Sequence, residues 1–256
     1  MNHKQIRAFA QTLAEESGRI ILAHYLDPNL EVERKVDESP VTKADRETEI
    51  QMRKLIEKEF PEHGIVGEEL GSIREDAEYV WLLDPIDGTK SFITGVPLFG
   101  TLICLERQGE PILGVIHQPI IKQLMVGDNS QTTLNGKPVN FRKTTTLADA
   151  TILTTDERDA RKQFGAKTWS RLTDQASFTR TWGDCYGYLL LASGKADVMI
   201  DPIVNSWDFH VMLPIIKGAG GIITDHKGGN PLNGNSIVAS HPDLHDLIIN
   251  ELAHFQ

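Results

Sequence analysis

The sequence predicts a mixed fold, with an α+β arrangement in its first half and an α/β arrangement in its second half. In the first half, two segments with apolar residues at helical spacing precede a series of short apolar runs bounded by turn residues. In the second half, strand-like and helix-like segments alternate. With 256 residues, the chain is long enough for one large domain or two small ones.

The first half is predicted to begin with two helices. Apolar or small residues recur every three or four positions over residues 6–24 and again over 44–56, and Pro61 and Gly64 stop the second pattern. Residues 31–43 are charged and contain Ser39-Pro40, so we expect a loop between the helices.

Three apolar runs after the helices predict strands. Residues 80–83 form a short run typical of a buried strand, and the runs 99–105 and 112–116 are joined by a polar connection that predicts a hairpin. Asn135-Gly136 predicts a further tight turn.

The second half is predicted to alternate between the two kinds of element. The expected order is a strand at 151–155, a helix at 184–193, a strand at 197–201, a helix at 207–217 that contains Pro214, strands at 221–225 and 236–239, and a helix at 242–253. The composition changes near Thr144-Thr145-Thr146, so we expect an N-terminal subdomain at 1–145 and a C-terminal subdomain at 146–256.

The most informative segment is Asp84-Pro85-Ile86-Asp87-Gly88-Thr89, which directly follows the buried run. The strand delivers Asp84, and the turn brings Asp87 back beside it. Two carboxylates this close repel each other unless a proton or cation lies between them, and Mg²⁺ binds through few protein carboxylates together with water and phosphate. Gly88 and Thr89 suit a helix start, where exposed N–H groups attract phosphate oxygens. We expect a phosphoryl-transfer site; the alternative is two successive turns with both acids acting as caps.

Three other acidic positions are suggestive, but each also has a simple structural explanation. Glu68-Glu69 ends a short apolar run, so it either delivers a ligand at a strand end or lies in a surface loop. Asp45 fits a capping box at the start of the second helix. Asp208 follows Trp207 at another helix start, where the helix dipole favours a carboxylate.

Taken together, Gly67-Glu68-Glu69, the segment 84–89 and Trp207-Asp208 resemble, in order and spacing, the motifs of the inositol-monophosphatase-like superfamily. The resemblance runs from the first helix to the last. It implies a layered α-β-α-β-α sandwich of the inositol monophosphatase/fructose-bisphosphatase type. It also implies the activity of a Mg²⁺-dependent, typically lithium-sensitive phosphomonoesterase.

The resemblance further implies a metal centre. Glu68, Asp84, Asp87 and Asp208, with the carbonyl oxygen of Ile86, are expected to hold two or three Mg²⁺ ions. The substrate is also expected to contact four of these residues, namely Glu68, Ile86, Asp87 and Asp208. Because the 31–43 loop leads directly into the next candidate acid, Asp45, we also expect this loop to bear on metal binding.

The remaining implied roles concern water and phosphate. Asp45 and Thr89 resemble the catalytic pair that orients the attacking water and takes up its proton. Gly88 and Thr89 resemble the backbone that binds the phosphate oxygens.

The residues that flank the motif favour the histidinol-phosphatase branch. After Asp87 the chain reads Gly-Thr-Lys-Ser-Phe, where inositol monophosphatases usually show Gly-Thr-Thr-Asn-Phe and nucleotide phosphatases of sulfur metabolism show Gly-Thr-Lys-Glu-Phe. Segments 89–103 and 180–188 are similar to histidinol phosphatases. The expected substrate is therefore L-histidinol phosphate, and the expected pathway is histidine biosynthesis.

The same resemblance places Arg180, Gly183, Asp184 and Asp201 on the substrate side of the site. Histidinol phosphate carries an ammonium and an imidazole, both of which bind carboxylates, so either acid is suited to the ammonium. The alternatives are a helix N-cap for Asp184 and a strand-end acid for Asp201. Arg180 fits either a structural ion pair or a phosphate contact.

Other functions stay open. Within the superfamily, the alternative is an inositol monophosphatase or a phosphoadenosine phosphate nucleotidase; in a different class, it is a metal-dependent RNA-associated regulator. The net charge of −10, from 26 Lys and Arg against 36 Asp and Glu, counts against a nucleic-acid partner. We expect a small phosphate ester as substrate and, from the resemblance, a homodimer.

Several absences narrow the setting of the protein. Two cysteines provide neither a disulfide framework nor a cysteine zinc site. No apolar stretch reaches the roughly 18 residues of a membrane span, so we expect no membrane partner and a cytoplasmic location. His241 and His245 are expected on a solvated helix face and not on zinc.

Overall fold

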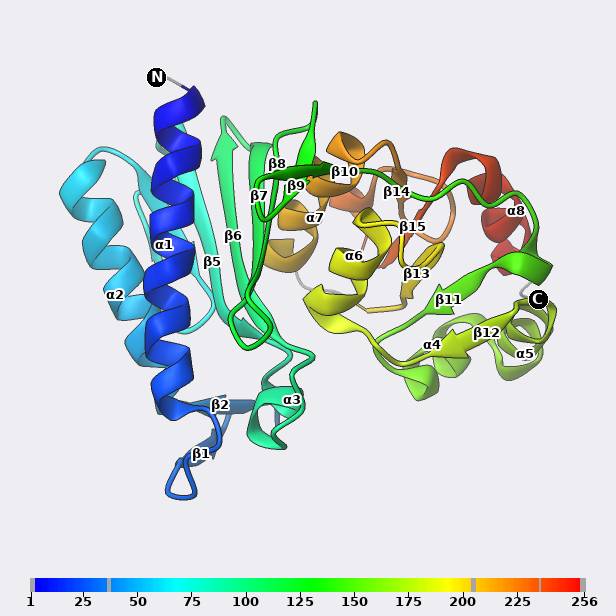
Figure 1. Ribbon diagram of the computed structural model, residues 1–256, viewed down its shortest axis with the longest axis horizontal. Coiled ribbons are helices and arrows are strands. Elements are labelled where there is room, and N and C mark those ends of the chain that lie inside the picture. The colour runs from blue at the N-terminus through cyan, green and yellow to red at the C-terminus, as the bar shows by residue number, and fades with distance from the viewer. Residues whose placement is uncertain (1–2, 36–37, 204–205, 235, 254–256) are drawn as a thin grey trace.

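The computed structural model describes residues 3–35, 38–203, 206–234 and 236–253, without the side chains of His3, Ser206, Trp207, Asp208 and Asn233. Five layers of helices and sheets are stacked on one another (Figure 1). This arrangement confirms the predicted layered sandwich, with its mixture of helices and sheets.

Helices form the two outer layers and the central layer. One outer layer contains α1 (His3–His24) and α2 (Lys43–Glu59). The central layer contains α6 (Asp184–Ala192) and α7 (Ser206–Gly218). The other outer layer contains α4 (Glu157–Phe164), α5 (Ala166–Gln175) and α8 (Pro242–Ala253).

The first sheet lies between the α1–α2 layer and the central helices (Figure 1). Its strand order is β10-β9-β8-β7-β6-β5-β3-β4, and every pair is antiparallel except β3 with β5. The strands are β3 (Gly64–Gly67), β4 (Gly71–Ile73), β5 (Tyr79–Asp87), β6 (Gly100–Arg107), β7 (Glu110–Gln118), β8 (Gln123–Gly127), β9 (Thr132–Leu134) and β10 (Lys137–Val139). Asn135 and Gly136, both with positive φ, form the predicted tight turn between β9 and β10.

The second sheet is built from the C-terminal half. Its order is β12-β11-β13-β15-β14, with β11 parallel to β12 and β13 and the other pairs antiparallel. The strands are β11 (Thr151–Leu153), β12 (Phe178–Arg180), β13 (Val198–Asp201), β14 (Ile222–Thr224) and β15 (Ile237–Ser240). Two short 3₁₀ helices also belong to this half: Leu147–Asp149 precedes β11, and Pro231–Asn233 lies between β14 and β15.

The predicted loop at 31–43 is wrong in part. β1 (Val32–Arg34) and β2 (Pro40–Thr42) pair as an antiparallel two-stranded sheet. All three residues of β1 are exposed, so this segment lacks the apolar alternation that predicts a strand.

The central helix α7 packs unusually close to the first sheet. A side chain at Gly114 of β7 would overlap the Val211 carbonyl oxygen, and one at Gly127 of β8 would overlap Ile215. The two glycines therefore let the helix approach the backbone of both strands. Pro214 lies inside α7, as predicted, on the side that faces this sheet.

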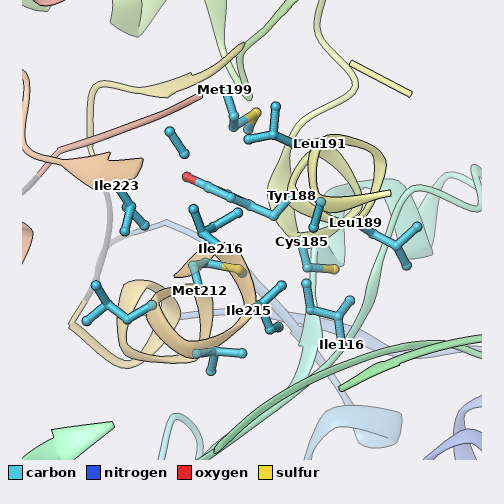
Figure 2. Packing of buried hydrophobic residues seen from close by; sticks show 14 of the residues in the cluster. Ile116, Cys185, Tyr188, Leu189, Leu191, Met199, Met212, Ile215, Ile216 and Ile223 are labelled. Atoms are coloured by element: carbon cyan, nitrogen blue, oxygen red, sulfur yellow. The ribbon is translucent and has the colours of Figure 1, made fainter. Parts of the chain in front are cut away.

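The core around the central layer is shown in Figure 2. Met212, Ile215 and Ile216 of α7 pack against side chains of α6. Both cysteines of the chain, Cys104 in β6 and Cys185 in α6, are free and lie buried in this core, between the first sheet and the central helices.

His245 departs from the expected solvated position. Its side chain is buried, and its ring nitrogens lie 2.9 Å from the hydroxyls of Thr224 and Ser240. The pair of hydroxyls satisfies the ring, so burial is compatible with a neutral histidine. Burial lowers its pKa.

No helix in the described part of the chain is both long and apolar enough to cross a bilayer.

Candidate active site

The acidic motif lies at the end of β5, where the strand leaves the sheet. Pairing with β6 is regular up to Asp84 and shifts register between Asp84 and Asp87. The backbone N–H of Ile86 donates to Oδ1 of Asp84 at 2.9 Å, and the Thr101 hydroxyl donates to the Pro85 carbonyl oxygen at 2.9 Å. Asp84 is buried, whereas Asp87 is half-buried at the edge of the core. The turn therefore holds the two acids in different environments.

Gly88 and Thr89 continue the motif into α3 (Thr89–Ile93). Gly88 adopts a left-handed conformation with φ of 86°, which glycine tolerates without steric cost. The Thr89 hydroxyl donates to the carbonyl oxygen of Ile86 at 3.0 Å. This bond fixes the direction of the carbonyl that the resemblance assigned to the metal.

Glu68 reaches the same region from the neighbouring strand. Its backbone N–H donates to the Leu83 carbonyl oxygen at 3.1 Å, which continues the parallel pairing of β3 with β5. The Lys35 ammonium lies 2.7 Å from Oε1 of both Glu68 and Glu69. Although partial burial opposes it, the hydrogen bonds to these two acids raise the pKa of Lys35.

Glu49, which sequence reasoning missed, fixes the turn that carries these acids. Its side chain is completely buried, and it accepts hydrogen bonds from the backbone N–H groups of Glu69 at 2.8 Å and Leu70 at 3.2 Å. Arg53 donates to the same carboxylate at 2.7 Å. In the sequence, Glu49 is one of many acids in a charged helix, so nothing distinguished it.

Asp45 forms the predicted capping box at the start of α2. Its Oδ2 accepts from the backbone N–H of Thr42 at 2.9 Å and from the Thr42 hydroxyl at 2.6 Å. Burial raises the pKa of Asp45 to about 6, with a further contribution from Glu68. No direct hydrogen bond joins Asp45 to Thr89 among the described residues; the charge of Glu68 acts on Asp45 nonetheless.

The N-terminus of α6 meets the motif from the central layer. The backbone N–H of Cys185 donates to Oδ2 of Asp87. Asp184, the first residue of α6, is not an N-cap, because Gly183 occupies that position. Its backbone is left-handed, with φ of 47°.

A small cavity of about 70 Å³ opens beside Asp87. It is lined by Asp87, Asp184, Asp201, Thr155, Tyr188, Ile203, Met212 and Ile237. Burial and the neighbouring Asp201 raise the pKa of Asp184 to about 7, against the opposing charge of Lys90. Burial also raises the pKa of Asp201. The cavity therefore brings two predicted substrate-side acids together next to the motif.

Arg180 lies apart from this cavity. It is exposed on the edge strand β12, and its guanidinium carbon lies 5.1 Å from the ring centre of Phe178 and 5.9 Å from that of Trp182. It donates to the Thr179 carbonyl oxygen at 2.8 Å. Stacking on two aromatic rings is thus what the structure shows for Arg180.

Asp208 belongs to the first turn of α7, but its side chain lies outside the part that the structure describes. Among the side chains that are described, no group of three or more His, Cys, Asp or Glu is arranged to hold a metal ion. The chemistry of the candidate donors nevertheless fits a hard divalent cation, because they are carboxylates and one carbonyl. Glu68 is paired with a lysine instead, which shows that the position accepts a positive charge.

Comparisons with known proteins cover almost the whole chain. The model of the inositol monophosphatase family matches residues 2–255. The chain is 40% identical over 258 residues to the bifunctional phosphatase IMPL2, chloroplastic, of Arabidopsis thaliana, covering 96% of this chain and 74% of the plant protein. It is 36% identical over 234 residues to a histidinol-phosphatase of Chlorobaculum parvum, covering 91% and 90% of the two chains.

A solved structure gives the same assignment. The structure of an inositol monophosphatase from Zymomonas mobilis matches with a TM-score of 0.87 and 35% identity, covering 99% of both chains. Fold, motif order and sequence therefore agree, and this chain belongs to the inositol monophosphatase family, whose members form a superfamily of metal-dependent phosphatases.

Proposed function

We propose that the protein is a Mg²⁺-dependent phosphomonoesterase that hydrolyses L-histidinol phosphate to L-histidinol and phosphate, a step of histidine biosynthesis. The observation that supports this choice of substrate is the cavity in which Asp184 and Asp201 lie beside Asp87. Two acids suit a cationic alcohol, whereas the hydroxyls of an inositol ring need only neutral partners. The similarity to a histidinol-phosphatase supports the same choice.

In this proposal, Glu68, Asp84, Asp87 and Asp208 and the Ile86 carbonyl would hold two or three Mg²⁺ ions. Bound Mg²⁺ lowers the pKa of water and offsets the negative charge that develops on the phosphate oxygens. The backbone at Gly88 and Thr89 positions the phosphate. Asp45 serves as the base, and its buried carboxyl takes up a proton more readily than an exposed one.

The proposed function is tested by phosphate release from the purified protein with and without Mg²⁺. L-histidinol phosphate, inositol monophosphate and phosphoadenosine phosphate are offered side by side, and Asp84→Asn is the control variant. We expect Mg²⁺-dependent release with a strong preference for histidinol phosphate, and a loss of more than about 100-fold in the variant, because partners of metal ligands alone are worth 10- to 100-fold. Preference for another ester would refute the substrate, and no release from any ester would refute the activity.

Two companion proposals concern setting and partners. We propose a homodimer located in the cytoplasm, which light scattering and cell fractionation test. For the RNA-associated alternative, the test is filter binding with a salt series, because phosphate contacts make binding weaken steeply with salt. The net charge of −10 leads us to expect no salt-sensitive RNA retention.

A further inference from the structure

The backbone of Asp184 is held in a conformation that aspartate rarely adopts. Its φ of 47° lies in the left-handed region, which is unfavourable for residues with a side chain, although less so for aspartate and asparagine than for most. Such a conformation persists only where the surroundings enforce it. Here the N–H of Asp184 donates to the Thr155 hydroxyl at 2.9 Å.

Gly183 brings the two segments close enough for that bond. A side chain at Gly183 would overlap the backbone and hydroxyl of Thr155, so only glycine fits between them. Thr155 follows β11, and Gly183 and Asp184 begin α6. The contact therefore joins the second sheet to the central helix layer at the cavity.

Thr155 also fixes the second acid. Its backbone N–H donates to Oδ1 of Asp201 at 3.0 Å, and the Tyr188 hydroxyl donates to Oδ2 of Asp201 at 2.7 Å. Both oxygens of Asp201 thus have protein donors. The carboxylate of Asp184 accepts no hydrogen bond from any described residue, so it is the acid with capacity left for a ligand.

The Asp184 carboxylate lies directly against the acidic motif. A Cβ placed on Gly88 would be 3.1 Å from Oδ2 of Asp184. The proposed function puts the substrate phosphate at Gly88 and Thr89. A cation bound to Asp184 would therefore lie only a few bonds from the phosphorus atom.

We propose that Thr155 is a positioning residue that turns Asp184 toward Gly88, and that this pair selects phosphomonoesters of 2-amino alcohols. In these compounds the ammonium stands on the carbon next to the ester CH₂ group. The inference rests on the proposed function for the place of the phosphate, but it concerns a class of substrates that is wider than histidinol phosphate. Ethanolamine phosphate is its smallest member.

The chain provides a matched control. Thr154 is the neighbour of Thr155, is completely buried, and its hydroxyl has no hydrogen-bond partner in the described part of the molecule. Thr154→Val and Thr155→Val remove the same atom from adjacent residues, but only the second removes the bond to Asp184. Thr155→Ser keeps the hydroxyl and should therefore keep the selectivity for esters of 2-amino alcohols.

The experiment compares kcat/KM, at saturating Mg²⁺, for pairs of esters that differ only in the ammonium. The pairs are 2-aminoethyl phosphate with ethyl phosphate, and 3-aminopropyl phosphate with propyl phosphate; L-histidinol phosphate is measured alongside. We expect the wild type to favour the 2-amino ester over its neutral partner by about tenfold or more, and the 3-amino ester by clearly less.

In Thr155→Val the preference for the 2-amino ester should fall by about tenfold, mainly through KM, whereas Thr155→Ser and Thr154→Val keep it. A merely structural role would lower the rate for both esters and leave their ratio unchanged. Asp184→Asn keeps a residue that tolerates left-handed backbone but removes the charge, so its ratio should approach one even if Thr155→Val does not fold.

An unchanged ratio in Thr155→Val or in Asp184→Asn would overturn the inference, as would a wild type that does not distinguish the 2-amino ester from ethyl phosphate. If the wild type shows the expected ratios but does not cleave histidinol phosphate, the proposed function fails and this inference stands. If the wild type cleaves histidinol phosphate but the ratio is the same in Thr155→Val, the proposed function stands and this inference fails.

Discussion

The ammonium group of Lys35 lies 2.7 Å from Oε1 of Glu68, a residue assigned to the proposed metal centre. The second partner of Lys35, Glu69, is nearly buried, and burial raises its pKa to about 7. Lys35 directly follows β1, so the paired segment β1–β2 is tied to this edge of the site. Residues 31–43 were expected to bear on metal binding, and this contact provides a physical reason for that expectation.

Replacing Lys35 with methionine is expected to strengthen Mg²⁺ binding. The substitution removes a cation that competes for Glu68, and the gain should be roughly tenfold or less because the site is partly solvated. Titration calorimetry with Mg²⁺ measures it. Arg46→Met is the control, since Arg46 pairs with exposed Glu33 of the same segment. Weaker binding in Lys35→Met alone would show that Lys35 supports the centre and does not compete with it.

Asp45→Asn is expected to separate capping from proton transfer. The side-chain oxygen of asparagine can still accept the bonds from Thr42 that complete the capping box, so the free energy of unfolding should change by no more than about 1 kcal/mol. Loss of the base should lower kcat by about 10²- to 10⁴-fold. Rate measurements at saturating Mg²⁺ and urea unfolding decide between the roles. A stability loss with a nearly normal kcat would leave Asp45 with its capping box alone.

Acid is expected to destabilise the fold partly through His245. Burial lowers its pKa in the folded state, so the unfolded chain, with a histidine pKa near 6.5, binds more protons. Stability contributed by this group is therefore present above about pH 6.5 and is lost as the pH falls toward the lower folded value. The slope is at most about 1.4 kcal/mol per pH unit.

Urea unfolding between about pH 7.5 and 5.5 measures this slope in the wild type and in His245→Gln. The variant should show a shallower dependence, although burial also lowers the pKa of His63, His117 and His226, which it retains. Equal slopes in the two proteins would mean that His245 titrates alike in the folded and unfolded states.

Gly114→Ala is expected to destabilise the contact between α7 and the first sheet. The added methyl group would overlap the Val211 carbonyl oxygen, a backbone atom that cannot turn aside. Overpacking of this kind costs about 1–3 kcal/mol. Thermal unfolding checks it, with Gly234→Ala, where the nearest atom is 3.2 Å away, as the comparison. A melting temperature equal to that of the wild type would show that α7 shifts to accommodate the methyl group.

Local patterns were sufficient for much of the fold. The strand that carries Asp84 and the turn at Asn135-Gly136 both depend on neighbouring residues, and both were predicted correctly. α4, α5 and β12 were not predicted. Their segment is dominated by charged and polar residues, and the few buried ones, such as Phe164 and Trp169, gain meaning only from packing in three dimensions.

The site shows the same division. Asp84 and Asp87 belong to one continuous motif, so these two acids were recognisable without a structure, whereas Asp45, Glu68 and Asp208 were assigned only through the resemblance of separate segments to a known family. Lys35, Glu49 and Thr155 were not recognised, because each acts through a partner from a distant segment. The side chain of Asp208 stays a prediction.

The burial of Cys104 and Cys185 has a practical consequence. A thiol reagent reaches them only when the helices of the central layer part from the sheet, so the rate of alkylation in native buffer reports how often that layer opens. The backbone N–H of Cys185 donates a hydrogen bond to Asp87 at the active-site end, whereas Cys104 lies in the middle of β6. Identifying which thiol is alkylated first would therefore distinguish a local opening of the active-site end from a separation of the whole layer. No engineered label is needed.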